Sequence, residues 1–244
     1  MYSKNDPWKE LQPLLPLKNR ITYESINGMD IHIDKYERNA KTSVVVLHGV
    51  GGNGRLFSFF AVPLVRAGYN VLCPDLPGYG CSKYRKRVTY CDWIDVGSKI
   101  VEKELLKSRT VFLIGLSAGG MLAYNVACRH QEISGLIVTN LLDNGEAEVR
   151  IYSAKNRFQA TYGIKLLSLL PPFLRSFKVP IKMVTKMDAL VNNGEMLKVL
   201  LKDKSGAGSR VDLGFLLSMM KAAPVKEPED FNKPPVLMVH PGRD

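Results

Sequence analysis

Apolar and polar residues alternate over residues 21–37 (ITYESINGMDIHIDKYE), on both sides of Asn27-Gly28. Alternation is typical of a strand with one buried face, and Asn-Gly fits the tight type I′ turn between two antiparallel strands. The stretch therefore predicts a β-hairpin. Beyond residue 41 the pattern changes to short apolar runs, which are separated by segments with the spacing of amphipathic helices.

These runs predict a series of strands joined by helices. The apolar runs that predict strands lie at 42–47, 70–74, 110–116, 135–142 and 235–240. The segments with helical spacing lie at 55–67, 90–107 and 118–130. Strands joined through helices pair in parallel, because the helix carries the chain back to the same end of the sheet. We expect an α/β fold, with a mostly parallel sheet and helices on both faces.

Residues 145–232 interrupt this alternation. They are helix-like and carry no clear strand, with a break at Pro171-Pro172 and a loose linker predicted at 205–209 (SGAGS). The segment is predicted to be an insertion between the sixth and seventh strands of the sheet. The chain then divides into a first part of the sheet domain at 1–144, an insertion at 145–232, and a continuation of the sheet at 233–244.

Composition limits the class of protein. The chain has 244 residues, 45% of them hydrophobic, which excludes a disordered tail, a collagen-like repeat and a coiled coil. No apolar run approaches the roughly 20 residues of a membrane-spanning helix, and the first residues lack the features of a signal peptide. Four cysteines without metal-binding spacing predict buried thiols and no metal site. We therefore expect a cytoplasmic protein.

The chain is basic, with 34 Lys and Arg against 23 Asp and Glu. Lys83, Arg85, Lys86 and Arg87 form the densest run, and the insertion carries 14 basic against 9 acidic residues. This excess fits either an ordinary solvated surface or a weak contact with an anionic membrane surface. No aromatic residues are interleaved with it in a nucleic-acid motif, so we expect no nucleic-acid partner. The oligomeric state is left open.

A Gly-x-Ser-x-Gly motif at 115–119 (GLSAG) follows one predicted strand and opens the next helix. This is the context of a nucleophile elbow, in which a strained turn presents the serine, Ser117, to solvent. Small residues at Gly115 and Gly119 let the strand and the helix approach closely. The alternative is an ordinary strand–helix turn whose serine caps the helix.

A glycine-rich segment at 48–54 (HGVGGNG) follows the first parallel strand. It fits an oxyanion loop, in which Gly49 lets the N–H of Val50 act together with the N–H of Ala118, and His48 braces the loop. It also contains a formal G-x-G-x-x-G, with Asp75 placed 21 residues after Gly54, as in a dinucleotide-binding fingerprint. The preceding hairpin, the turn-rich DLPGYGCS that begins at Asp75 and the serine motif favour the oxyanion loop. We expect no cofactor.

The order of HGVGGNG, DLPGYGCS and GLSAG between strands and helices resembles the α/β-hydrolase superfamily, in particular its monoacylglycerol-lipase-like and serine-aminopeptidase-like serine hydrolases. The resemblance begins near residue 21, and the insertion resembles that family's cap over the active site. It implies Ser117 as nucleophile, Val50 and Ala118 as oxyanion-hole donors, and Asp244 as triad acid. Asp143 is an alternative acid. The function implied is hydrolysis of a carboxylic ester through an acyl-serine.

The histidines depart from the superfamily pattern, in which the catalytic histidine follows the acid. His32, His48, His130 and His240 all precede Asp244, and we interpret each as structural. We expect the catalytic histidine beyond residue 244, and doubtful activity from residues 1–244 alone. Two alternatives stay open: an inactive hydrolase-fold protein that binds a ligand, and a nicotinamide-dependent oxidoreductase.

Apolar residues of the insertion suggest a hydrophobic small-molecule substrate, and the same residues could instead pack the insertion onto the sheet. They are Leu166, Leu167, Leu170, Phe173, Leu174, Leu216, Leu217, Met219 and Met220.

Overall fold

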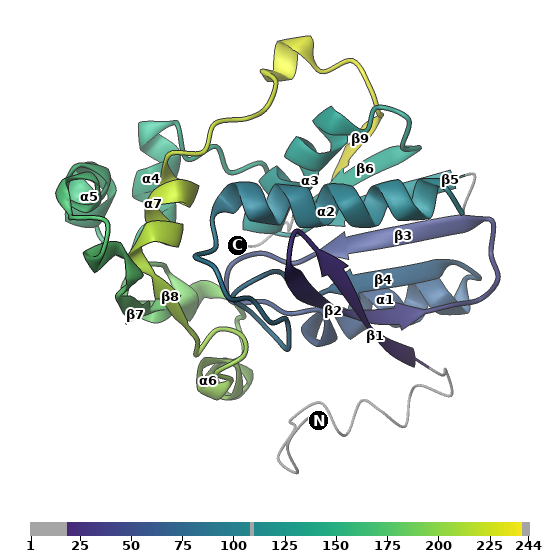
Figure 1. Ribbon diagram of the computed structural model, residues 1–244, viewed down its shortest axis with the longest axis horizontal. Helices are drawn as coiled ribbons and strands as arrows, with labels where there is room; N and C mark the ends of the chain where they lie inside the picture. The colour runs from purple at the N-terminus through teal and green to yellow at the C-terminus, as the bar shows by residue number, and fades with distance from the viewer. Residues whose placement is uncertain (1–18, 108–109, 241–244) are drawn as a thin grey trace.

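A twisted sheet of seven strands, in the order β1-β2-β4-β3-β5-β6-β9, forms the centre of the molecule (Figure 1). The computed structural model describes residues 19–107 and 110–240. The strands of this sheet are β1 (Asn19–Ile26), β2 (Met29–Tyr36), β3 (Thr42–Leu47), β4 (Asn70–Pro74), β5 (Thr110–Gly115), β6 (Gly135–Val138) and β9 (Val236–Met238).

The predicted hairpin is confirmed. Strands β1 and β2 pair antiparallel, with Ile26 opposite Met29. Asn27 and Gly28 between them have φ angles of 51° and 75°, as a type I′ turn requires. β2 also pairs antiparallel with β4, whereas β3, β4, β5, β6 and β9 pair in parallel. The mostly parallel sheet is therefore confirmed.

Helices cover both faces of the sheet, as expected (Figure 1). α2 (Tyr90–Leu105) and α3 (Ala118–Arg129) pack together on one face. α1 (Ser58–Arg66) packs on the other face against β4, after a 3-10 turn, η2 (Arg55–Phe57). α2 begins at a capping box, in which Thr89 and Asp92 each bond the other's backbone N–H.

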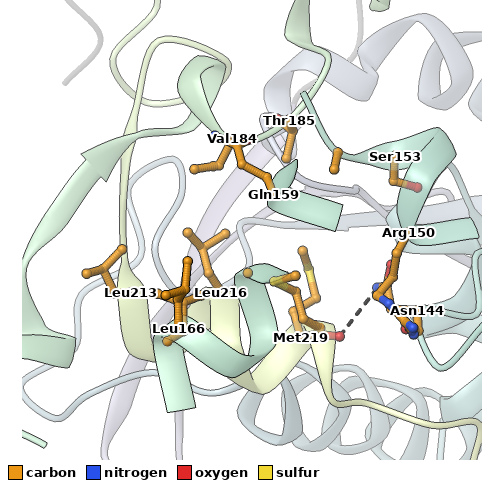
Figure 2. A pocket seen from close by; sticks show the side chains of 14 residues that line it. Asn144, Arg150, Ser153, Gln159, Leu166, Val184, Thr185, Leu213, Leu216 and Met219 are labelled. Atoms are coloured by element: carbon orange, nitrogen blue, oxygen red, sulfur yellow. Dashed lines mark hydrogen bonds between the residues drawn. The ribbon is translucent and has the colours of Figure 1, made fainter. Parts of the chain in front are cut away.

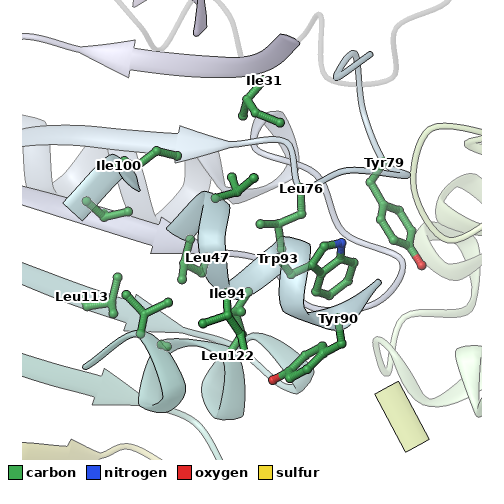
Figure 3. Close-up of a cluster of buried hydrophobic side chains, with 14 of the residues drawn as sticks. Ile31, Leu47, Leu76, Tyr79, Tyr90, Trp93, Ile94, Ile100, Leu113 and Leu122 are labelled. Carbon is green, nitrogen blue, oxygen red and sulfur yellow. The ribbon is translucent and has the colours of Figure 1, made fainter. Parts of the chain in front are cut away.

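The larger apolar core lies between the sheet and α2 with α3 (Figure 3). Trp93 of α2 is fully buried there, and its Nε1 donates a hydrogen bond to the carbonyl of Pro77 at 2.9 Å. This contact ties the loop after β4 to the core. Cys73 and Cys128 are buried free thiols, as predicted, while Cys81 is half-buried and Cys91 is exposed.

The insertion between β6 and β9 forms a separate helical layer beside the carboxyl ends of the strands (Figure 1). Its helices are α4 (Ala147–Ser153), α5 (Arg157–Leu169), α6 (Gly194–Lys202) and α7 (Leu213–Met220). Its 3-10 turns are η3 (Leu174–Ser176), η4 (Ile181–Met183), η5 (Met187–Ala189) and η6 (Pro228–Asp230). No helix in the described part of the chain is both long and apolar enough to cross a bilayer.

Two predictions about this insertion are wrong. It does contain strands: β7 (Lys178–Pro180) and β8 (Arg210–Asp212) form an antiparallel pair. Each of these strands has three residues, which are too few to show an alternating pattern, so neither strand could be predicted from periodicity. The predicted loose linker at 205–209 is also ordered against the sheet domain, where the carbonyl of Ser205 accepts a hydrogen bond from the N–H of Gly80 at 2.9 Å.

Several predicted strands are shorter than their apolar runs. The run at 110–116 pairs only as far as Gly115, that at 135–142 ends at Val138, and that at 235–240 pairs only over Val236–Met238. The backbone leaves the sheet at these points to form the loops at its carboxyl edge. Ladder pairing, not apolar character, sets where a strand ends.

Candidate active site

The turn between β5 and α3 presents Ser117 to solvent in a strained conformation. Ser117 has φ of 81° and ψ of −123°, a region that a residue with a Cβ rarely adopts. Its N–H donates to Oγ1 of Thr139 at 3.2 Å, and the N–H of Thr139 donates to the carbonyl of Gly115. The hydroxyl of Ser117 makes no capping hydrogen bond to α3, contrary to the capping alternative. No motif signalled the supporting role of Thr139.

Two glycines make this turn sterically feasible. A Cβ on Gly115 would overlap the carbonyl oxygen of Gly119 and lie 2.7 Å from Cβ of Ala123. A Cβ on Gly119 would lie 2.5 Å from the carbonyl oxygen of Leu47 at the end of β3. Strand and helix therefore approach at backbone distance, as expected for the GLSAG segment.

The glycine-rich loop after β3 lies directly against the serine turn. A Cβ on Gly49 would lie 2.8 Å from the carbonyl oxygen of Leu116 and 3.1 Å from the amide nitrogen of Ala118. Within residues 19–107 and 110–240, no backbone carbonyl accepts a hydrogen bond from the N–H of Val50 or Ala118. Among the described residues, two backbone N–H groups of the glycine-rich loop and the serine turn thus have no backbone acceptor, one of them at the N-terminus of α3.

His48 holds this loop in place. The ring is completely buried, and its Nδ1 lies 2.8 Å from the carbonyl of Gly49 while its Nε2 accepts the N–H of Leu76 at 2.9 Å. Because both nitrogens have backbone partners, the ring is the neutral tautomer with the proton on Nδ1. Burial lowers the pKa of His48 below its usual value. The loop-bracing interpretation of His48 fits this geometry.

Asp75 connects the glycine-rich loop after β3 with the loop after β4. Its side chain is fully buried, and its carboxylate accepts the N–H of Gly54 at 2.6 Å and the N–H of Cys81 at 2.7 Å. Nδ1 of His32 lies 2.8 Å from the same carboxylate. A dinucleotide fingerprint needs this acid free to bind a ribose. Here the carboxylate is committed to the protein's own donors, which argues against the oxidoreductase alternative.

One group of side chains has the ligand types of a metal site. Nδ1 of His32, a carboxylate oxygen of Asp75 and Sγ of Cys81 all lie within 4.8 Å of one another. The Asp75 oxygens already accept two backbone N–H groups, which a cation would displace. We therefore interpret the group as a structural network between the hairpin and the loop after β4. The sequence spacing of these residues gave no sign of their proximity.

The other candidate residues lie at the end of α3, beyond β9 and in the loop after β6. His130 ends α3 near Glu132, with its Nδ1 3.4 Å from that carboxylate, and His240 is exposed beyond β9. Asp143 is half-buried, and its Oδ1 accepts the N–H of Gly145 at 2.7 Å. Asp244 lies outside the described residues.

A cavity of about 220 Å³ opens inside the insertion, between α4, α5 and α7 (Figure 2). Its wall is largely apolar, with Arg150 and Asn144 at one end. Asn144 Nδ2 donates to the carbonyl of Met219 across this end at 3.3 Å. Five of the nine apolar residues singled out in the sequence line the cavity: Leu166, Leu167, Leu216, Met219 and Met220.

Arg150 lines the cavity, and no sequence motif predicted a role for it. Nη1 of Arg150 donates to the carbonyls of Asn144 at 2.7 Å and Gly145 at 2.5 Å. These carbonyls belong to the loop that leaves β6, so Arg150 fixes the junction between the sheet and the insertion. A lone arginine in an amphipathic helix carries no sequence signal for such a role.

Comparisons with known proteins agree with this architecture. Residues 42–192 match the family model of the alpha/beta hydrolase fold. A thermostable monoacylglycerol lipase of Bacillus sp. (strain H-257) is 30% identical over 106 residues, which are 43% of this chain and 42% of the lipase. A magnesium-chelatase 30 kDa subunit of Rhodobacter capsulatus is 34% identical over 90 residues, which are 34% of this chain and 29% of that subunit. The chain thus spans less than half the length of these relatives.

Solved structures share the fold over more of the chain. A soluble variant of monoglyceride lipase from Saccharomyces cerevisiae, in complex with a substrate analog, superposes with a TM-score of 0.66 and 20% identity, covering 83% of this chain and 68% of that one. A monoacylglycerol lipase from Paleococcus ferrophilus gives 0.61 and 19%, covering 78% and 68%. With a family model that matches most of the sheet and the serine turn, the chain belongs to the alpha/beta hydrolase fold family.

Proposed function

We propose that this protein is a serine hydrolase that cleaves carboxylic esters through an acyl-serine intermediate. The observation that carries the proposal is the strained, exposed Ser117 beside the available N–H groups of Val50 and Ala118. A strained turn that exposes a hydroxyl next to two free backbone donors is the arrangement that acyl transfer requires.

The chemistry follows from this arrangement. Ser117 Oγ attacks the ester carbonyl carbon and loses its proton to a general base, while the carbonyl oxygen becomes an oxyanion held by Val50 and Ala118. Collapse of the tetrahedral intermediate expels the alcohol, which takes up that proton, and leaves an ester between Ser117 and the acyl group. Water then attacks the acyl carbon by the same steps in reverse, releasing the carboxylic acid and the free serine.

The position of the general base is a separate proposal. His48 has both ring nitrogens bonded to the backbone, and no side chain in these ranges hydrogen-bonds the Ser117 hydroxyl. We propose that a segment after residue 244 carries the histidine and that Asp244 orients it. Asp143 is the alternative acid, at the cost of its hydrogen bond to Gly145.

The exposed strand β9 supports this proposal. Within the described residues β9 pairs only with β6, and Val236, Leu237 and Met238 are 42%, 57% and 51% exposed. An apolar strand whose far edge is unpaired, within the described residues, fits the addition of a further strand beside it. Such a strand would bring the following segment to the carboxyl edge of the sheet, where Ser117 lies.

The cavity of the insertion supports a hydrophobic acyl substrate. Its wall presents leucine and methionine side chains, which favour aliphatic chains over polar ligands. One curated relative and two of the similar solved structures are named as monoacylglycerol or monoglyceride lipases. These names point to the same class of ester. The insertion would then serve as a cap that holds the acyl chain.

A labelling experiment tests the proposal. The full-length protein, from its complete reading frame, should react with a fluorophosphonate probe at Ser117, and S117A should not react. S176A, which changes an exposed serine of η3, should label like the parent. Absence of labelling in the folded full-length protein would refute the acyl-serine proposal and favour a hydrolase-fold binding protein.

The position of the base is tested separately. Residues 1–244 alone should show no turnover of short p-nitrophenyl esters above the S117A background. Turnover by this fragment that is abolished in S117A would show that the base lies within 1–244, and the proposed position of the histidine would be wrong.

A further inference from the structure

α5 is the outermost helix of the cap (Figure 1), and one face of it carries exposed apolar side chains. Residues at spacing i, i+4, i+8 and i+11 share one face of a helix. On α5 that face carries side chains that are 63%, 48%, 51% and 82% exposed, namely Phe158, Tyr162, Leu166 and Leu169. The rings of Phe158 and Tyr162 contact each other with centroids 5.2 Å apart. A surface helix of a globular protein normally buries such a stripe.

Further exposed apolar side chains lie in the segment that follows α5. Phe173, Phe177 and Met183 are 71%, 63% and 59% exposed. The chain at Met183 is tied to α5, because Nε2 of Gln159 donates to the Met183 carbonyl at 3.1 Å. We call the α5 stripe together with these three residues the outer cap face. Exposed apolar residues that recur in one segment mark a surface of interaction.

The charged side chains of α5 and the segment that follows it are all positive. Residues 150–187 contain eight Lys and Arg and no Asp or Glu. Arg157 and Lys165 are eight positions apart on the row of α5 next to the apolar stripe, and both are exposed, as is Lys182. Within the described residues none of these three forms an ion pair. Lys155, by contrast, pairs with Asp188 at 2.9 Å.

We propose that the outer cap face docks on an anionic lipid surface. Aromatic and leucine side chains on one row with unpaired cations on the next are what an interfacial helix needs: the apolar row enters the headgroup region and the cations contact anionic headgroups. The all-positive charge of residues 150–187 disfavours a second copy of this chain, because two such faces repel each other. The inference does not depend on the chemistry of Ser117.

Leu166 connects the proposed docking surface with the cavity. Leu166 belongs to the outer cap face and also lines the cavity between α4, α5 and α7. A protein docked through α5 therefore holds the wall of the cavity against the bilayer. Hydrophobic ligands that are dissolved in the bilayer would reach the cavity at this wall without crossing water.

Vesicle co-sedimentation tests the proposal. Full-length S117A, which separates binding from turnover, is mixed with vesicles of phosphatidylcholine alone or with about 30 mol% phosphatidylglycerol. We expect binding to the anionic vesicles to be at least about tenfold stronger, and to fall when the salt is raised to about 0.5 M. Equal binding to both kinds of vesicle, or none to either, would overturn the proposal.

Two sets of variants locate the surface. F158S/Y162S/L169S removes the apolar row and R157E/K165E/K182E reverses the cations; each should weaken binding to anionic vesicles about tenfold or more. The matched controls, F59S on exposed α1 and R38E/K41E/R85E on the sheet domain, should bind like the parent.

Thermal melts verify that all variants remain folded, and gel filtration reports self-association. Unchanged vesicle binding by both cap variants would place the lipid contact elsewhere and overturn the proposal. A concentration-dependent dimer that F158S/Y162S/L169S abolishes, without vesicle binding by the parent, would identify a second copy as the occupant.

Discussion

The Oδ1 atom of Asp75 accepts the backbone N–H of Gly54 at 2.6 Å, across two loops separated by 21 residues. Gly54 stands where only a glycine fits, because a Cβ there would overlap the carbonyl oxygen of Cys73. The other oxygen of Asp75 accepts the N–H of Cys81. One buried carboxylate thereby fixes the glycine-rich loop after β3 and the loop after β4 relative to each other.

Asp75→Asn should destabilise the protein by about 2–4 kcal/mol, because the amide NH₂ would face a backbone N–H that now has a carboxylate acceptor. Urea unfolding followed by tryptophan fluorescence measures the change. Asp95→Asn is the matched control, since Asp95 is 38% exposed and pairs with the exposed Arg129; its effect should stay below about 0.5 kcal/mol. Equal effects of the two substitutions would contradict the connecting role of Asp75.

Gly119→Ala should disrupt the serine turn, because the new Cβ would lie 2.5 Å from the carbonyl oxygen of Leu47 and 2.8 Å from that of His48. We expect a loss of about 2 kcal/mol or more in unfolding free energy, together with loss of fluorophosphonate labelling at Ser117. Gly194→Ala, in α6, meets nothing within 4 Å and should leave both measurements unchanged. Labelling that survives in Gly119→Ala would show that the turn tolerates a shift of α3.

The strand–helix alternation could be predicted from the sequence because the sheet is buried on both faces. A run such as TSVVVL at 42–47 ends in four consecutive apolar residues, and the glycines after it mark the turn. The serine turn was predictable because its motif is local: Gly115, Ser117 and Gly119 lie within five residues. Local patterns of this kind predict the structure and the chemistry of a single segment of the chain.

Contacts between distant segments were not predictable. Asn53 Nδ2 donates to Asp203 Oδ2 and to Ser205 Oγ, each at 3.3 Å, across about 150 positions of sequence. These bonds hold the start of the 205–209 segment, which was predicted to be a loose linker. Arg150 and Thr139 likewise act through backbone groups, which have no residue signature. The exposure of the α5 stripe was hidden too, because helical spacing indicates an apolar face without saying what covers it.

His48 predicts a specific pH dependence of stability. Burial lowers its pKa in the folded state, so between that value and 6.5 the unfolded chain binds a proton that the folded protein does not. Stability contributed by the neutral ring is therefore complete above about pH 6.5 and falls as the pH drops, by at most about 1.4 kcal/mol per pH unit.

Urea titrations of the parent and His48→Gln between pH 8 and pH 5 check this. The glutamine variant should be less stable at pH 8, and the difference between the two proteins should shrink below pH 6.5 as the parent loses the neutral-ring contribution. Carboxylates titrate in both proteins and cancel in the difference. Parallel stability curves would show that His48 stays uncoupled from folding in this range.

Arg150→Met should loosen the junction between the sheet and the cap while keeping side-chain length. The substitution removes the donor to the carbonyls of Asn144 and Gly145, so we expect about 1–3 kcal/mol of destabilisation and faster hydrogen exchange at the amides of Gly145 and Glu146. Lys155→Met is the control, because its pair with Asp188 is exposed. Because Asp143 lies on this junction, a triad that used Asp143 would lose esterase activity in Arg150→Met, whereas one that used Asp244 would keep most of it.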